Sequence, residues 1–155
     1  ADLAPAEHRL AMLTAAIAGD ERFACCEIEL RRAGPSYSVD TVRELRARHE
    51  GVDFFFLIGS DSLFDLHGWR RAEELIQSCE WIVVARPGFD MQSLSPDALG
   101  LSADLAARAT ARVVAGHPVG ISSSDIRMRV AEGLDVKYLV PPAVERYIDE
   151  QRLYR

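Results

Sequence analysis

The sequence predicts an α/β fold, with a parallel sheet covered by helices on both faces. Apolar runs of strand length, at residues 53–58 and 81–85, alternate with segments of helical periodicity. Both runs are continuous, which is typical of strands buried on both faces of a parallel sheet. Polar turns follow them at residues 59–61 and 86–88. Ligands of such folds bind at the carboxyl ends of the strands, so these turns are candidate site segments.

The first third of the chain predicts a helix, a strand and a second helix. A helix is expected over residues 5–18, because proline suits a helix start, apolar residues recur on one face and a glycine follows. Residues 23–30 alternate in polarity, which predicts a strand. A second helix is expected to begin at Tyr37 or Ser38 and to end by residues 49–51.

The rest of the chain continues the alternation of strand and helix. After the strand at residues 53–58, a short helical turn and a helix over residues 70–77 are expected. Residues 89–111 predict a loop with one short helix at its end. A buried strand and two closing helices are then expected at residues 112–118, 122–132 and 143–151.

Length and composition predict one domain, residues 1–155. The formal net charge is −6, from 18 basic and 24 acidic residues, which argues against a protein that coats nucleic acid. No apolar run approaches the roughly 18 residues of a membrane span. The three cysteines, Cys25, Cys26 and Cys79, lack metal-ligand spacing and predict buried thiols in a reducing cytoplasm.

The segment Gly120–Val130 carries the strongest functional signal. Ser122 and Asp125 form a capping box at the start of the expected helix, and Ser122, Ser123 and Ser124 would surround free helix-terminal amides, a setting suited to phosphate. Arg127 lies one turn inside, where the helix dipole opposes a cation by roughly 0.3–1 kcal/mol. An anion bound at the helix N-terminus would attract the Arg127 guanidinium, so the electrostatic energy of Arg127 at this position would become favourable. An ordinary well-capped helix explains the residues equally well.

Further candidates lie at other turns, each with a structural alternative. Gly59 allows close approach of a ligand and Asp61 can accept from ribose hydroxyls, although a helix cap explains both. Trp69 can stack on a flat heterocycle or cover the core, and taken alone the core is favoured. Ser38 opens a helix whose amides can bind a carboxylate, or simply caps it. Arg86 can meet a phosphate or be an exposed residue at a strand end.

Taken in order, these segments resemble the bacterial nicotinate-nucleotide adenylyltransferases of the nucleotidyltransferase superfamily. Residues 121–127 match the superfamily signature I-S-[ST]-[ST]-x-I-R. Three further segments narrow the resemblance to the nicotinate-nucleotide branch. They are residues 35–38 (P-S-Y-S), residues 59–63 (G-S-D-S-L) and the following Gly68-Trp69. Ser38 and Ser124 stand where threonine is usual, and they keep the hydroxyl.

The resemblance implies a Rossmann-like fold and transfer of AMP from ATP to nicotinate mononucleotide, giving deamido-NAD and pyrophosphate in NAD biosynthesis. It implies Mg²⁺ that arrives on ATP, cytoplasmic localisation and a possible homo-oligomer. Trp69 would stack on the pyridine ring and Ser38 would receive its carboxylate. Arg127 would stabilise the phosphates. The ATP site carried over by the resemblance comprises Gly59, Asp61, Arg86, Ile121, Ser122, Ser123, Ser124 and Arg127.

The chain departs from the family pattern at its start. The family's catalytic G-G-x-F-D-P-x-H-x-G-H segment and the second strand with its Pro-Pro-His loop are absent, and residues 5–18 resemble the helix that follows them. We therefore expect this chain to be the carboxyl-terminal portion of a longer protein, with a sheet incomplete at the N-terminus and no activity alone. The alternatives are an adenylyltransferase for nicotinamide mononucleotide or phosphopantetheine, and a non-catalytic nucleotide-binding module.

Overall fold

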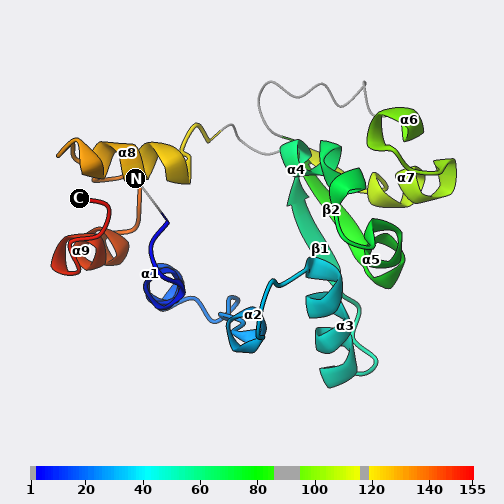
Figure 1. Ribbon diagram of the computed structural model, residues 1–155, viewed down its shortest axis with the longest axis horizontal. Helices are drawn as coiled ribbons and strands as arrows, with labels where there is room; N and C mark the ends of the chain where they lie inside the picture. Colours follow the sequence, from blue (N-terminus) through cyan, green and yellow to red (C-terminus); the bar gives the residue numbers. More distant parts are fainter. Residues whose placement is uncertain (1–2, 86–94, 116–118) are drawn as a thin grey trace. The chain divides into compact units, whose positions relative to one another are not determined.

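The computed structural model describes residues 3–85, 95–115 and 119–155 and divides the chain into two compact units. One unit, Arg32–Pro118, holds the sheet, and the other combines Ala1–Arg31 with Val119–Arg155 (Figure 1). The assignment of residues 1–155 to one domain stays a prediction.

The sheet of the α/β unit has three parallel strands in the order β1-β2-β3. In its register Phe56 pairs with Trp81 and Ile58 with Val83. The strands are β1 (Phe55–Gly59), β2 (Glu80–Ala85) and β3 (Val113–Ala115). The parallel α/β class predicted from the alternating pattern is confirmed.

The helices of this unit are mostly short and follow the strands. The helix α6 lies within residues 89–111, where the sequence predicted a loop and only one short helix. Ser95 and Ser102 cap α6 and α7 by accepting from the amides of Ala98 and Leu105, at 3.1 Å and 3.4 Å. The helices are α3 (Ser38–Arg48), α4 (Ser60–Phe64), the 3₁₀ helix η1 (Leu66–Gly68), α5 (Ala72–Ser78), α6 (Pro96–Leu99) and α7 (Ala103–Ala109).

One face of the sheet forms the core of the α/β unit. Ile58, Trp81 and Val83 point to this face and are buried together with side chains of α3, α5 and α7. Phe55 and Leu57 point to the other face and are 48% and 66% exposed. The prediction that residues 53–58 are buried on both faces is therefore wrong. Among the described residues, helices of this unit cover only the face of the sheet that carries Ile58 and Val83.

The strand at residues 112–118 also differs from its prediction. Its described part is β3, and Val113 and Val114 are 44% and 46% exposed rather than buried. β3 pairs with β2 alone, so it is an edge strand among the described residues. Burial depends on what packs against a strand, which a local apolar run does not specify.

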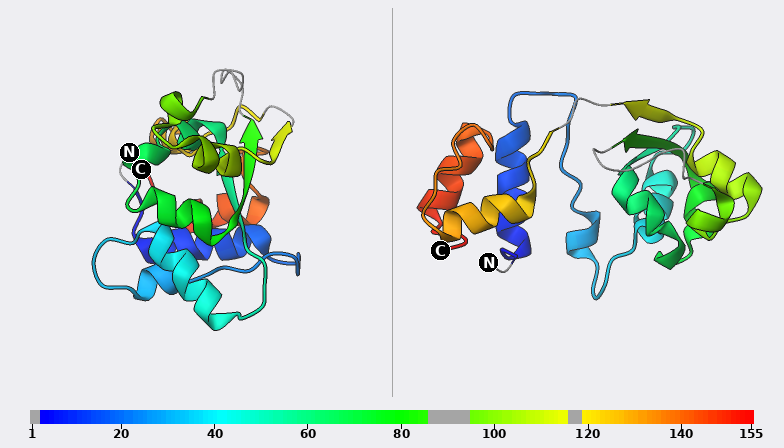
Figure 2. Two further views of the ribbon diagram at one scale, coloured as in Figure 1. Left: turned by 90° about the vertical axis from the view of Figure 1, so that its right-hand side faces the viewer. Right: turned by 90° about the horizontal axis from the view of Figure 1, so that it is seen from above.

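The second unit is helical. Its core combines Ile126 and Val130 of α8 with Val144 and Ile148 of α9, and α1 packs against α9 in the views of Figure 2. The His8 Nδ1 atom lies 2.9 Å from the Tyr147 hydroxyl, which joins α1 to α9. The helices of this unit are α1 (Ala6–Ile17), α2 (Ile28–Arg31), α8 (Ser123–Ala131) and α9 (Pro142–Glu150). In neither unit does the described chain contain a helix that is long and apolar enough to cross a membrane.

The strand predicted at residues 23–30 is wrong. Residues 24–27 form no regular structure, and the short helix α2 begins at Ile28. No described strand pairs with this segment. An alternating pattern predicts a strand only when a neighbouring strand supplies the ladder hydrogen bonds, and here none does.

Candidate active site

A pocket of about 240 Å³ lies between the start of α3 and the segment that follows η1. It brings together Ser38 and Trp69, the two residues that the resemblance assigns to the acceptor. Tyr37 and Arg70 also line the pocket, and sequence reasoning did not assign them a role. The complete lining is Ser36, Tyr37, Ser38, Val39, Gly68, Trp69, Arg70 and Leu75.

Trp69 belongs to both the pocket and the core. Its amide donates to the Leu66 carbonyl at 3.0 Å, which ends η1. Its ring meets the Phe56 ring edge-on, with centroids 6.1 Å apart, and Phe56 in turn lies 4.9 Å from the Trp81 ring. The two interpretations of Trp69 are therefore compatible, since a half-buried ring packs on the core and still lines the pocket.

Ser38 is the first residue of α3, whose N-terminus borders the pocket. Tyr37 occupies the N-cap position, and its carbonyl accepts from the amides of Asp40 and Thr41 at 3.0 Å and 3.2 Å. The N-terminus of a helix carries a partial positive charge. This wall of the pocket therefore suits a negatively charged group.

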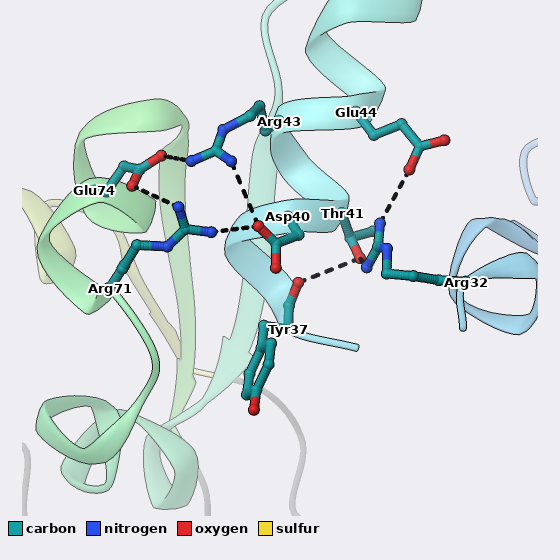
Figure 3. A network of polar contacts seen from close by, with 8 residues as sticks. All are labelled: Arg32, Tyr37, Asp40, Thr41, Arg43, Glu44, Arg71 and Glu74. Carbon is teal, nitrogen blue, oxygen red and sulfur yellow. Dashed lines mark hydrogen bonds and ion pairs between the residues drawn. The ribbon is translucent and has the colours of Figure 1, made fainter. Parts of the chain in front are cut away.

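A ring of charged side chains connects α3 to α5 (Figure 3). Asp40, in the first turn of α3, pairs with Arg71, the residue before α5. Arg43 bridges Asp40 and Glu74, and Glu74 also lies 3.5 Å from Arg71. Because α3 provides one wall of the pocket and the residues just before Arg71 provide the other, this ring fixes the walls relative to each other.

A second set of contacts holds the start of α3 in place (Figure 3). Arg32 pairs with Glu44 at 3.0 Å and donates to the Thr41 hydroxyl at 3.2 Å. The Thr41 hydroxyl donates to the Tyr37 carbonyl at 3.5 Å. These contacts attach the N-terminal turn that carries Tyr37 to the body of the helix and to the preceding chain.

Gly59 and Asp61 lie where the sequence predicted, at the carboxyl end of a parallel strand. Gly59 ends β1 and is the N-cap of α4, and Asp61 is in the first turn of that helix. Ser60 between them is fully buried. Gly59 pairs with Val84 of β2, so the two strands end at the same edge of the sheet. Arg86, two residues beyond Val84, lies outside the described residues.

The serine-rich turn forms the N-terminus of α8 in the helical unit. Ser122 is the N-cap and accepts from the Asp125 amide at 3.1 Å, as the capping pattern predicted. Ile121, Ser123 and Ser124 are exposed around it. The Arg127 guanidinium donates to the Ser124 hydroxyl at 3.2 Å, while its buried Nε has no hydrogen-bond partner within the described residues. A cation with an unused donor beside exposed helix-terminal hydroxyls suits an anion.

A larger pocket in the helical unit, about 580 Å³, contains none of the predicted site residues. It lies along the end of α8 and the segment 133–136, with Glu145 and Asp149 of α9 on its wall. Among the residues that the structure describes, no three His, Cys, Asp or Glu side chains gather closely enough to hold a metal ion. The candidate residues of the α/β unit lie at the end of β1 and in the α3 pocket, and those of the helical unit lie at the N-terminus of α8.

Comparison with known proteins identifies the family. The cytidylyltransferase-like family model matches residues 1–129. The chain is 44% identical over 154 residues to a probable nicotinate-nucleotide adenylyltransferase of Symbiobacterium thermophilum, covering 97% of this chain and 71% of that protein. The chain belongs to the nicotinate-nucleotide adenylyltransferase family. A second such relative, from Synechococcus sp. strain JA-3-3Ab, is 41% identical over 146 residues, which are 94% of this chain and 69% of the relative.

Solved structures confirm the nucleotidyltransferase fold. The nicotinic acid mononucleotide adenylyltransferase of Plasmodium falciparum, complexed with APC, matches with a TM-score of 0.73 at 20% identity, over 98% of this chain and 77% of that one. The same protein complexed with NaAD matches with a TM-score of 0.72 at 19% identity, over 99% and 76% of the two chains. The family and the fold that the ordered segments resembled are both confirmed.

The ion pair that joins α3 to α5 can be tested by a double-mutant cycle. We expect Asp40→Ala and Arg71→Ala to couple by about 0.2–1 kcal/mol in the free energy of unfolding, because the pair is partly exposed. Urea denaturation of the protein produced from the complete gene measures this coupling. The control is the exposed pair Glu44–Arg48 within α3, for which about 0.3–0.5 kcal/mol is expected. No coupling between Asp40 and Arg71 would mean that this ion pair does not help to join the two helices.

Proposed function

We propose that this adenylyltransferase transfers AMP from ATP to nicotinate mononucleotide, forming deamido-NAD and pyrophosphate. The observation that carries the proposal is the pocket that joins Trp69 to the N-terminus of α3. An aromatic ring beside a positively polarised helix end suits a flat heterocycle that carries a carboxylate. The relatives from Symbiobacterium and Synechococcus are named for this nucleotide.

The reaction needs little covalent chemistry from the protein. An oxygen of the acceptor phosphate attacks the α-phosphorus of ATP, the bond from that phosphorus to the bridging β-phosphate oxygen breaks, and pyrophosphate leaves. The attacking oxygen is already anionic, so no general base is required. Rate acceleration then comes from positioning the two phosphates and from stabilising negative charge in the transition state.

Two groups of residues are proposed to hold ATP. At the start of α8, Arg127 and the turn formed by Ile121, Ser122, Ser123 and Ser124 contact the triphosphate through the guanidinium, the hydroxyls and the backbone amides. At the end of β1, Gly59 allows close approach and Asp61 accepts from the nucleoside. Arg86 is proposed as a further phosphate contact.

The acceptor is proposed to bind in the α3 pocket. Trp69 stacks on the pyridine ring, and Ser38 with the first amides of α3 receives the carboxylate. Because Trp69 is supported by Phe56 and the core, its ring is held in place before the acceptor arrives. A preorganised stacking surface lowers the entropic cost of binding.

Magnesium is proposed to reach the site as part of the ATP substrate. Mg²⁺ prefers oxygen ligands, keeps several waters and is commonly bound through substrate phosphates and one or two carboxylates. Asp61 is the nearest candidate carboxylate to the strand end where the nucleotide is proposed to lie.

Acceptor preference tests the proposed function. We expect the protein produced from the complete gene to release pyrophosphate from ATP with nicotinate mononucleotide at a higher kcat/KM than with nicotinamide mononucleotide or phosphopantetheine. The three acceptors should be compared side by side under the same magnesium concentration. A higher value with either rival would reassign the acceptor. ATP binding without turnover of any acceptor would support a non-catalytic nucleotide-binding module instead.

Arg127 should matter for ATP far more than for folding. We expect Arg127→Ala to lower kcat/KM for ATP by about tenfold to a hundredfold, since a charge-assisted hydrogen bond to phosphate contributes roughly 1.5–3 kcal/mol. Steady-state kinetics and thermal melting of the same sample measure the two effects. Arg146→Ala, an exposed arginine on α9 in the same unit, is the matched control and should leave both unchanged. Unchanged ATP kinetics in Arg127→Ala would make Arg127 a structural residue.

Trp69 should matter mainly for the acceptor. We expect Trp69→Ala to raise the acceptor KM by about tenfold to a hundredfold, because stacking of a base on an aromatic side chain contributes roughly 1–3 kcal/mol. ATP kinetics should change little. Trp69→Phe keeps a ring against Phe56 and should restore most of the acceptor affinity. Equal weakening of both substrates, together with a large fall in melting temperature, would show that Trp69 serves the core alone.

A further inference from the structure

The two arginines that follow Trp69 have different surroundings. Arg71 is paired with Asp40 and Glu74. The Arg70 guanidinium instead lies 4.7 Å from the centroid of the Tyr37 ring, and within the described parts of the chain it forms no hydrogen bond or ion pair. The positive charge of Arg71 is therefore neutralised by carboxylates. The charge of Arg70 is not neutralised by any described side chain, and its five N–H donors stay available to a ligand.

Arg70 also determines the charge of the α3 pocket. Among the described residues it is the only charged one in the lining, which otherwise consists of serine, glycine, aromatic and aliphatic side chains. No carboxylate of the described chain lines the pocket to compensate it. The N-terminus of α3 adds partial positive charge at the same wall. The pocket therefore favours an anionic group over a neutral group of the same size.

Tyr37 gives this exposed arginine a defined place. A guanidinium prefers to stack on an aromatic face, which restricts an otherwise flexible side chain. Tyr37 is itself held at the N-cap of α3, because its carbonyl accepts from Asp40, Thr41 and the Thr41 hydroxyl. The ring thus fixes the Arg70 charge at the pocket wall without neutralising it.

We propose that Arg70, stacked on Tyr37, is a specificity-determining residue that selects a pyridine carboxylate over the corresponding carboxamide. The inference rests on the proposed function, since it concerns the same acceptor pocket. A carboxylate and a carboxamide have nearly the same size and shape, so stacking on Trp69 cannot separate them. They differ in charge and in the number of acceptors: a carboxylate offers a guanidinium two accepting oxygens and a negative charge, whereas a carboxamide offers one accepting oxygen and no net charge.

The test is the ratio of kcat/KM for nicotinate mononucleotide to kcat/KM for nicotinamide mononucleotide, measured on the protein produced from the complete gene. Arg70→Gln should lower this ratio by about tenfold or more, which corresponds to about 1.4 kcal/mol of lost discrimination. The loss should appear as a higher KM for the carboxylate acceptor, with the KM for ATP unchanged. Arg70→Lys should keep part of the ratio, because it retains the charge but loses the planar fork.

Two further variants separate this role from charge in general and from folding. Tyr37→Leu removes the stacking surface and should lower the ratio in the same direction, whereas Tyr37→Phe keeps the ring and should preserve it. Arg48→Gln removes the same charge from the exposed end of α3, away from the pocket lining, and should leave the ratio unchanged.

The possible failures are distinguishable. An unchanged ratio in Arg70→Gln, or an equal loss for both acceptors, would overturn the role of Arg70 while the proposed function stands. A fall of the same size in Arg48→Gln would also overturn it, because net charge alone would then explain the effect. A wild-type protein that uses neither acceptor would overturn the proposed function itself.

Discussion

The stack of three aromatic rings, Trp81, Phe56 and Trp69, connects the buried sheet to the acceptor pocket. Trp81 is almost completely buried, and Phe56 pairs with it in the parallel register of β1 and β2. Trp69 rests on Phe56 and lines the pocket. The same register ends β1 at Gly59, where α4 begins beside the proposed nucleotide contacts. A shift of β1 against β2 would therefore displace the stacking surface and the strand end together, which makes this pairing the constraint on which the site depends.

The arrangement of arginines explains how an acidic protein can bind polyanionic substrates. The net charge of −6 opposes ATP and a nucleotide acceptor at long range, so attraction has to be local. In the α/β unit, Arg32, Arg43 and Arg71 are paired with carboxylates and serve the framework. Arg70 forms no such pair among the described residues, and Arg127 donates only to a serine hydroxyl. Both cations therefore keep donors for the carboxylate and the phosphates that they are proposed to face.

Local signals predicted the helices well, and long-range features poorly. The helices α1, α8 and α9 lie within one or two residues of the predicted ranges, because caps, prolines and apolar spacing act within a few residues. The predictions of a strand at residues 23–30 and of a buried Leu57 were wrong. Both features depend on which segments pack against the residues, and a local sequence pattern does not specify those segments. Ser38, Gly59 and Trp69 were found through motif order, but Tyr37 and Arg70 became candidates only when the structure placed them on one pocket.

Because the proposed reaction needs no acid or base, residues that never touch a substrate can still control its rate. Positioning two phosphates for in-line transfer is sensitive to distance, and a misplacement of about 1 Å can cost on the order of a hundredfold in rate. Asp40 and Arg71 set the spacing between α3 and the segment that carries Trp69, and hence the position of the pyridine ring and of the phosphate attached to it. Loosening this pair should therefore lower kcat even when the acceptor still binds, whereas loss of Arg70 should act on the choice of acceptor. The two adjacent arginines would then divide the work, with one fixing where the acceptor lies and the other fixing which acceptor it is.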